Sequence, residues 1–404
     1  MDDNPVRKML GRRLRLAVIG GGPGSFIGGM HRAAARLDDR YELVASALSS
    51  DPELARAAGV GLGIAADRAY GDGTELVEAE SARADGVDVV SIMTPNDSHH
   101  AYAAAALDRG LDVICDKPIT NTLDEALDLV ERAARAGLVF CLTHNYTGYP
   151  MVRQAKAMVE DGRLGDIRLV QVEYVQGGKA NESDPSPETA LSWRYDPIRG
   201  GPSLVMGDIG THAHNLARFI TGIEVASVAA EVGAIVPGRL VHDYAAAMLR
   251  FDNGARGTFW VTQAAAGVEN CLRIRVSGSR ASLEWNQENP TRLLFSPIDG
   301  PAESRTPNGP GTLPLAARST RIVAGHPEAF LEAFANLYSD AAEAIAARRS
   351  GEMPDPMALH FPNARDGAIG LAFVEAAIAS SNAGGAWTDA THPVLARTTN
   401  RSAS

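Results

Sequence analysis

A glycine cluster follows the first apolar run of the chain and limits what the N-terminal part can fold into. Residues 14–19 predict a short buried strand, and Gly20, Gly21, Gly22 and Gly24 come directly after it. Glycines between a strand and a helix let the backbone approach a dinucleotide pyrophosphate, and the helix N-terminus supplies N–H groups and a favourable dipole. The pattern favours a nucleotide-binding loop, and a glycine-rich β-turn without a ligand is the structural alternative.

The spacing of these glycines departs from the usual fingerprint. Gly20 and Gly22 supply its first two positions, but Ser25 stands where the third glycine is expected. Gly28 is the better candidate for that position, so we expect a loop about three residues longer than the usual form.

Apolar strands alternate with Ala-rich helical stretches through the first 150 residues. We expect strands at 14–19, 41–48, 87–93, 113–115 and 139–143, and helices at 30–37, 52–58, 74–83, 101–109 and 122–136. Such alternation predicts an α/β fold with a parallel sheet and helices on both faces, and ligands bind beyond the carboxyl ends of its strands.

The pattern changes after about residue 150 to a series of alternating strands. We expect strands at 167–175, 225–232, 244–251, 257–263, 272–277 and 282–285, helices at 151–161, 202–221, 327–348 and 366–380, and a long excursion over 286–325 that forms an interface arm. Strands of this kind predict a large open, mainly antiparallel sheet with one face covered. We therefore expect a Rossmann dinucleotide-binding domain over 1–150, a substrate-binding and oligomerisation domain over 151–395 and a disordered tail over 396–404.

Composition excludes several other classes of protein. A net charge of −11 argues against nucleic acid or an anionic membrane as the main partner. Cys115, Cys141 and Cys271 are too few and too scattered for a disulfide framework or a zinc site, so we expect no metal. The sequence has no run approaching the roughly 20 apolar residues of a membrane span and no signal peptide, which points to the cytoplasm.

Three further clusters follow strands or open a helix, at residues 94–99 (TPNDSH), 115–118 (CDKP) and 207–212 (GDIGTH). With the glycine loop, Trp193-Arg194 and Gly200-Gly201, they resemble the glucose–fructose oxidoreductase, inositol dehydrogenase and rhizopine-catabolism (Gfo/Idh/MocA) family of NAD(P)-dependent oxidoreductases. The resemblance covers most of the chain. It implies an N-terminal Rossmann domain followed by an α/β domain with a large open sheet.

The resemblance assigns catalysis to Lys117, Asp208 and His212, and their chemistry agrees. Oxidation of an alcohol needs a base near the hydroxyl, and the ordinary pKa of His212 lies near working pH. Asp208 precedes it by four residues, so on a helix its carboxylate can orient the imidazole and hold substrate hydroxyls. Lys117, at the end of a strand, can polarise the reacting oxygen. A helix cap, a surface histidine and a turn lysine are the structural alternatives.

Two departures from the family pattern affect the cofactor site. Asp116 stands where the family usually has Glu before the lysine, and we expect the Lys117–Pro118 bond to be cis, as in relatives. Ser49 stands near the place where NAD enzymes carry an acid, and Arg56 is a turn away. We expect NAD, with NADP as the alternative.

The remaining candidates are grouped by the ligand that we expect them to contact. The cofactor-binding residues are Gly20, Gly22, Pro23, Gly24, Ser25, Phe26, Ile27, Ser49, Thr94, Pro95, Asn96, His99, Asp116, Lys117 and Asn145. The substrate-binding residues are Lys117, Tyr146, Tyr174, Trp193, Arg194, Asp208, His212 and His326. Both polar and apolar side chains occur in the second group, as polyol binding requires.

These features predict a dehydrogenase that oxidises a ring secondary hydroxyl of a neutral sugar, glycoside or cyclitol to a ketone. One alternative keeps the fold and reduces an imine, a dihydrodiol or a tetrapyrrole, and another is a non-catalytic NAD-binding regulator. Retention of Lys117, Asp208 and His212 disfavours both. One uncovered sheet face predicts a homodimer or homotetramer.

Overall fold

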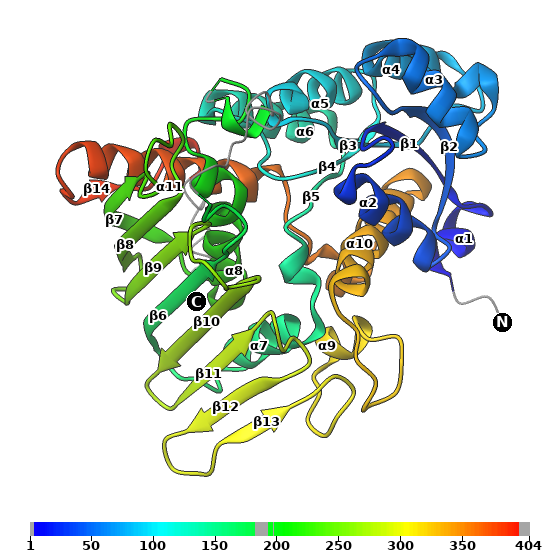
Figure 1. Cartoon of the computed structure of the whole chain (residues 1–404). Coiled ribbons are helices and arrows are strands. Elements are labelled where there is room, and N and C mark those ends of the chain that lie inside the picture. The colour runs from blue at the N-terminus through cyan, green and yellow to red at the C-terminus, as the bar shows by residue number, and fades with distance from the viewer. Residues whose placement is uncertain (1–3, 182–192, 197, 396–404) are drawn as a thin grey trace.

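The computed structural model describes residues 4–181, 193–196 and 198–395, and it arranges them around two sheets (Figure 1). The first sheet is parallel, with the order β2-β1-β3-β4-β5. Its strands are β1 (Leu14–Gly20), β2 (Tyr41–Ala47), β3 (Val89–Met93), β4 (Asp112–Cys115) and β5 (Phe140–Leu142). The expected parallel sheet is confirmed. The predicted tail, residues 396–404, lies outside the described residues.

Helices cover both faces of this sheet because β1 is apolar on both sides. Leu16 and Val18 face a core shared with α1 (Pro5–Leu10), α2 (Phe26–Leu37) and α10 (Phe330–Ser350), and α3 (Pro52–Gly61) adds Ala58 to it. Ala17 and Ile19 face the opposite core. That core also contains side chains of α4 (Gly73–Ala82), α5 (His99–Asp108), α6 (Leu123–Ala136) and α11 (Ala364–Asn382). Successive strand residues point to opposite faces, so both faces need a cover.

The second sheet has the order β13-β12-β11-β10-β6-β9-β8-β7-β14, and only the β6–β9 pair is parallel among its described strands. Its strands are β6 (Ile167–Val175), β7 (Val225–Gly233), β8 (Tyr244–Phe251), β9 (Arg256–Thr262), β10 (Cys271–Gly278), β11 (Ala281–Asn286), β12 (Leu293–Pro297), β13 (Glu303–Arg305) and β14 (Thr388–Asp389). The predicted open, mainly antiparallel sheet is confirmed.

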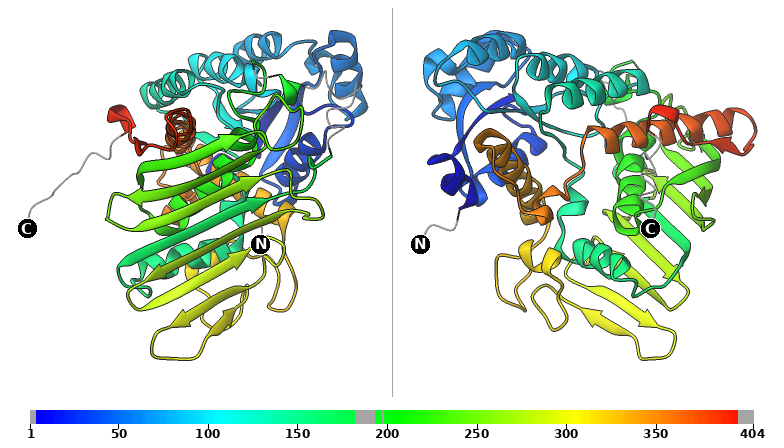
Figure 2. Two further views of the ribbon diagram at one scale, coloured as in Figure 1. Left: turned by 60° about the vertical axis from the view of Figure 1, so that its left-hand side comes forward. Right: turned by 180° about the vertical axis from the view of Figure 1, so that it is seen from behind.

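One face of the second sheet is covered and the other is open. The helices α7 (Pro150–Glu160), α8 (Thr211–Thr221) and α11 pack against the covered face, while the left view of Figure 2 shows no helix of the described chain across the other. We propose a division of the chain near residue 150, with α10 returning from the second unit to pack on the first. Of the helices that the structure describes, none is long and apolar enough to cross a membrane.

Some expectations about single elements were wrong. The excursion over 286–325 contains β12 and β13, which extend the sheet, and the short helix α9 (Pro314–Arg318). The predicted helix 327–348 is α10, which begins at Phe330 and is buried at every residue from Ala333 to Ala347. The predicted helix 202–221 contains a π-helical segment, Met206–Gly210, before α8. The helix after the glycine loop begins at Phe26, four residues earlier than expected.

Candidate active site

The glycine loop packs so closely against its neighbours that side chains at several of its glycines would collide with the protein itself. Gly20 and Gly21 have φ angles of 80° and 65°, a backbone conformation that favours glycine. A Cβ on Gly22 would collide with the carbonyl oxygen of Leu48, and a Cβ on Gly28 would collide with the carbonyl of Gly21. Gly28 therefore permits close packing of helix and strand, the part that the third glycine plays in a dinucleotide fingerprint. Gly20 and Gly21 also line the cleft at the end of β1, the place where a dinucleotide pyrophosphate binds in folds of this kind.

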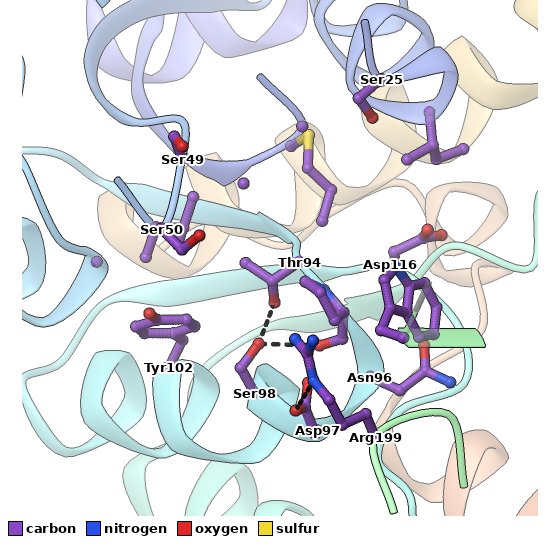
Figure 3. A pocket seen from close by; sticks show the side chains of 18 of the residues that line it. Ser25, Ser49, Ser50, Thr94, Asn96, Asp97, Ser98, Tyr102, Asp116 and Arg199 are labelled. Atoms are coloured by element: carbon purple, nitrogen blue, oxygen red, sulfur yellow. Dashed lines mark hydrogen bonds and ion pairs between the residues drawn. The ribbon is translucent and has the colours of Figure 1, made fainter. Parts of the chain in front are cut away.

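A cleft of about 490 Å³ opens beside this loop, at the carboxyl ends of β1 to β4. The close-up in Figure 3 shows Ser49 and Ser50 on one side of the cleft and Asp116 on the other. The second unit contributes Trp193, Arg194, Arg199, Gly200, Leu204 and Asp208 to the lining. The cleft therefore lies between the two units, and it is closed on one side by the segment around Gly200.

Polar contacts hold that segment against the first unit. The Asn96 amide donates to the carbonyl of Gly200 at 3.3 Å, and the Arg199 guanidinium pairs with Asp97 at 2.9 Å (Figure 3). The Asn121 amide donates to the carbonyl of Ile198 at 3.1 Å. These contacts hold the segment around Gly200 against the residues that follow β3 and β4.

Lys117 and Asp208 meet across the cleft. The Lys117 Nζ lies 2.8 Å from Asp208 Oδ1 and 2.7 Å from the Asp208 carbonyl oxygen. The other carboxylate oxygen of Asp208 accepts a hydrogen bond from Gln263 Nε2 at 2.8 Å. Burial alone would raise the pKa of Asp208, but the Lys117 ammonium and the Gln263 amide outweigh it and lower that pKa to about 2. Asp208 is thus a carboxylate at every working pH.

His212 has a different partner from the one that its spacing to Asp208 predicts. No hydrogen bond among the described residues joins Asp208 to His212, because both carboxylate oxygens of Asp208 are engaged elsewhere. Instead, His212 Nδ1 lies 3.3 Å from His144 Nδ1. The expectation that Asp208 orients the imidazole was wrong. Its carboxylate instead holds the lysine and faces the cleft.

A hydrogen-bonded group of neutral side chains surrounds the His212 ring. The Tyr146 ring lies edge-on to it, with centroids 4.8 Å apart, and the hydroxyls of Tyr146 and Tyr174 are hydrogen-bonded to each other. Tyr174 also donates to Asn270 Oδ1 at 2.8 Å, and Asn270 accepts from Gln176 Nε2 at 2.6 Å. Burial raises the pKa of both tyrosines, so their hydroxyls remain neutral donors and acceptors.

The structure brings most of the predicted cofactor residues to the cleft. Those that line it are Gly20, Ser25, Ile27, Ser49, Thr94, Pro95, Asn96, Asp116 and Lys117. Gly22, Pro23, Gly24 and Phe26 belong to the glycine loop and the start of α2. His99 and Asn145 are buried nearby: His99 contacts the carbonyls of Pro118 and Thr94, and Asn145 Nδ2 has no partner among the described residues. The Lys117–Pro118 bond is cis, as predicted.

The predicted substrate residues divide into two groups. Trp193 and Arg194 line the cleft, with the guanidinium 4.5 Å from the centre of the indole ring, and Tyr146 and Tyr174 lie beside His212. His326 is separate: it is exposed, and its ring contacts the carbonyl of Val323. The structure does not bring His326 to the cleft.

Residue types and spacing did not point to several residues of this site. His144, Gln263 and Asn270 contact the predicted residues directly, and Asp72 and Tyr102 line the cleft beside Ser50. One signal for His144 was present, because it follows β5 at the carboxyl edge of the parallel sheet, where ligands bind. Within the described residues, no group of His, Cys, Asp or Glu is arranged to hold a metal ion.

Comparisons with known proteins agree with this geometry. Residues 14–144 match a family model described as "Oxidoreductase family, NAD-binding Rossmann fold", and residues 152–284 match the "GFO/IDH/MocA C-terminal domain". An uncharacterized oxidoreductase of Bacillus subtilis, YfiI, is 33% identical over 385 residues, which are 95% of this chain and 98% of the relative. Levoglucosan dehydrogenase of Pseudarthrobacter phenanthrenivorans is 27% identical over 360 residues, which are 78% of this chain and 88% of the relative.

A solved structure shares the whole architecture. The crystal structure of an inositol dehydrogenase homolog from Azotobacter vinelandii, complexed with NAD+, superposes with a TM-score of 0.88 at 38% identity. The match covers 94% of this chain and 97% of that one.

Proposed function

The chain belongs to the Gfo/Idh/MocA family of oxidoreductases, and we propose that it oxidises a ring secondary hydroxyl of a sugar, glycoside or cyclitol to a ketone, reversibly, with NAD. The observation that carries this proposal is the cleft that brings the Lys117–Asp208 pair beside the glycine loop, with buried His212 at the start of the helix that follows Asp208. The levoglucosan dehydrogenase and the inositol dehydrogenase homolog among its relatives support a polyol substrate.

In this proposal each catalytic side chain has a separate task. When bound, oxidised nicotinamide supplies a hydride acceptor. His212 Nε2 takes the proton of the reacting hydroxyl while a hydride leaves the carbon that bears this hydroxyl, so that a carbonyl forms. The Lys117 ammonium donates to the reacting oxygen and stabilises its developing negative charge. Asp208 holds that ammonium in place and accepts a hydrogen bond from a neighbouring substrate hydroxyl.

The side chains in the cleft and around His212 support a neutral polyol substrate. Asp208 carries a negative charge, and Tyr146, Tyr174 and Asn270 offer neutral hydrogen-bonding groups beside His212. Trp193 supplies an apolar surface of the kind on which the face of a sugar ring packs. A hydrocarbon would leave these polar groups unpaired.

The adenosine end of the cleft supports NAD over NADP. Ser49, Ser50 and Tyr102 lie at this end of the cleft (Figure 3). Asp72 also lines it, and the Tyr102 hydroxyl lies 3.4 Å from its carboxylate. Arg56, the cation nearest to the serines in sequence, is bound to both oxygens of Glu75 at 3.1 and 3.0 Å. Hydroxyls and a carboxylate suit the free ribose hydroxyls, whereas a 2′-phosphate would meet negative charge.

Formation of reduced nicotinamide tests the function directly. With NAD and NADP in parallel, across inositols, aldoses and anhydrosugars, we expect NAD-dependent absorbance with one polyol class. Lys117→Met and His212→Asn should each lower kcat by at least about 100-fold, the range of a general acid or base, and leave the Kd for NADH within about twofold. Near-normal turnover in either variant would remove that residue from the mechanism. Cofactor binding without turnover of any polyol would favour the regulator.

A further inference from the structure

Two buried imidazoles meet at the inner wall of the proposed site. His144 follows β5, His212 belongs to α8, and their Nδ1 atoms lie 3.3 Å apart with the rings at 77°. The exposed fractions are only 2% for His144 and 7% for His212. We propose that His144 is a positioning residue that fixes the tautomer of His212. This inference rests on the proposed function of His212 as the base.

The other groups near His212 are engaged elsewhere. Asp208 gives one carboxylate oxygen to Lys117 and the other to Gln263, each at 2.8 Å. The Tyr146 ring lies edge-on to the imidazole, and its hydroxyl is hydrogen-bonded to that of Tyr174. The hydrogen bond that orients His212 within the described structure is therefore the one to His144.

A hydrogen bond between two imidazole nitrogens contains one proton. The ring that donates it determines whether His212 Nε2 has a lone pair and can act as a base. Nδ1 of His212 faces His144, so Nε2 is the nitrogen left for the substrate. A base needs a lone pair at Nε2, and a neutral imidazole then carries its proton on Nδ1. His144 Nδ1 must accept that proton's hydrogen bond, which places the His144 proton on its own Nε2.

The hydrogen bond from His212 to His144 persists as the proposed reaction proceeds. When His212 Nε2 takes the proton of the substrate hydroxyl, His212 becomes an imidazolium, and its Nδ1–H continues to donate to His144. No atom of His144 changes its covalent bonds in this step. A neutral acceptor suits this site because burial lowers the pKa of both rings, and a second carboxylate would add uncompensated buried charge.

The tautomer of His212 is measurable without turnover. In protein labelled with 15N-histidine, two-bond proton–nitrogen spectra distinguish Nδ1–H from Nε2–H imidazole, and the signals lost in His212→Asn identify this residue. We expect His212 to be the Nδ1–H tautomer in the wild type. His144→Leu should shift it to Nε2–H, while His144→Asn, whose side-chain oxygen can stand near the position of Nδ1, should retain it. An Nε2–H tautomer in the wild type, or no change in His144→Leu, would overturn the inference.

Kinetics should follow the tautomer. We expect His144→Leu to lower kcat by about 100-fold with little change in KM or in the Kd for NADH, and His144→Asn to recover at least about tenfold of that loss. Equal loss in the leucine and asparagine variants would show that the ring matters only for packing. If the wild type oxidises no polyol, the proposed function fails, whereas the spectra still decide the role of His144.

His214, which lies on α8 with His212, provides a matched control for the His144 variants. It is buried, and its ring stacks on Phe373 with centroids 4.4 Å apart, well matched to the burial of His144. His214→Leu should disturb packing by a similar amount while leaving the His212 tautomer and kcat near those of the wild type. A loss of kcat as large as that of His144→Leu would assign both effects to packing.

Discussion

Burial keeps the imidazoles near the active site neutral. Burial, with smaller contributions from nearby cations, lowers the pKa of His144 to about 3, lowers that of His214 to about 3, and holds that of His212 well below its ordinary value. In the unfolded chain each of these residues titrates near the ordinary value of about 6.5. The unfolded state therefore binds more protons than the folded state below that pH.

We predict a steep loss of stability under mild acid for this reason. A depressed folded-state pKa gives stability that is complete above the unfolded value and is lost as pH falls towards the folded value. These three residues alone should lower the free energy of unfolding by up to about 4 kcal/mol for each pH unit once the pH is well below 6.5. His242 and His360, whose pKa values burial also lowers, add to the slope. Urea unfolding at intervals from pH 7.5 to 5 measures this slope, above the range in which most carboxylates titrate.

His214→Gln isolates one residue of the three. The slope should fall by about 1.4 kcal/mol per pH unit, which is the contribution of one proton. The wild type, unfolded over the same pH series, is the reference for this slope. An unaltered slope in His214→Gln would mean that this imidazole is protonated in the folded protein.

Single residues show where sequence reasoning succeeds and where it stops. Lys117, Asp208 and His212 stand in short motifs next to predicted strand ends or a helix, so their types and positions were enough to select them. His144 becomes a partner of His212 only when α8 is laid against the loop after β5, and 68 residues separate the two. The spacing of Asp208 and His212 did not predict the hydrogen-bond partner of either side chain.

At the scale of elements, the glycine loop can be tested by adding one methyl group. A Cβ at position 22 would overlap the Leu48 carbonyl oxygen, so Gly22→Ala must move the loop away from β2. We predict that NADH binds at least about tenfold more weakly, a difference of about 1.4 kcal/mol. A fluorescence titration of NADH measures the change.

The helix after the loop provides the control. Gly29 lies in α2, and a Cβ there would have no other atom within 4 Å. Gly29→Ala should keep the affinity for NADH and raise the melting temperature, because alanine favours a helix over glycine by about 1 kcal/mol. If Gly22→Ala bound NADH as tightly as Gly29→Ala, the loop would not be the pyrophosphate-binding site.

Helices and strands with a clear pattern of apolar residues were predicted well, and those without such a pattern were not. The strand predicted over 167–175 matches β6. Its apolar residues are frequent, and the nearest glycines, Gly165 and Gly177, lie outside it. The strand β12 was missed because it is short, ends in Pro297 and lies among prolines and glycines that are typical of loops. The helix α10 was predicted, but the burial of its charged residues Asp340 and Glu343 was not. Ion pairs to Arg153 and Arg318 allow both to be buried.

At the scale of the whole molecule, the contact between the two proposed units could not be read from either half of the sequence. The site depends on it, since Lys117 comes from the first unit and Asp208 from the second. Segments that join the units, such as α10 packing on α2, connect residues about 300 positions apart, for example Arg40 and Ser339 at 2.8 Å. Local periodicity carries no signal for such pairings, whereas the family resemblance supplied the arrangement as a whole.

The open face of the second sheet carries large apolar side chains that one molecule does not cover. Leu169, Met248 and Trp260 stand on this face of neighbouring strands, with exposed fractions of 53%, 57% and 41%. Arg273 and Arg275 share Glu284 beside them, so the charges there are already paired. An apolar centre with a paired polar border is typical of an interface between subunits.

We therefore predict a homodimer or homotetramer that buries this face. In a two-fold interface each residue meets the same surface of its partner, so Met248→Glu introduces two carboxylates into one apolar contact. Light scattering coupled to size exclusion should show an oligomer for the wild type and a monomer for Met248→Glu at micromolar concentration. Leu54→Glu is the control, because Leu54 is exposed on α3 of the other unit and its change should leave the oligomer intact. A monomeric wild type at this concentration would mean that the sheet face is covered by something other than a second copy of the chain.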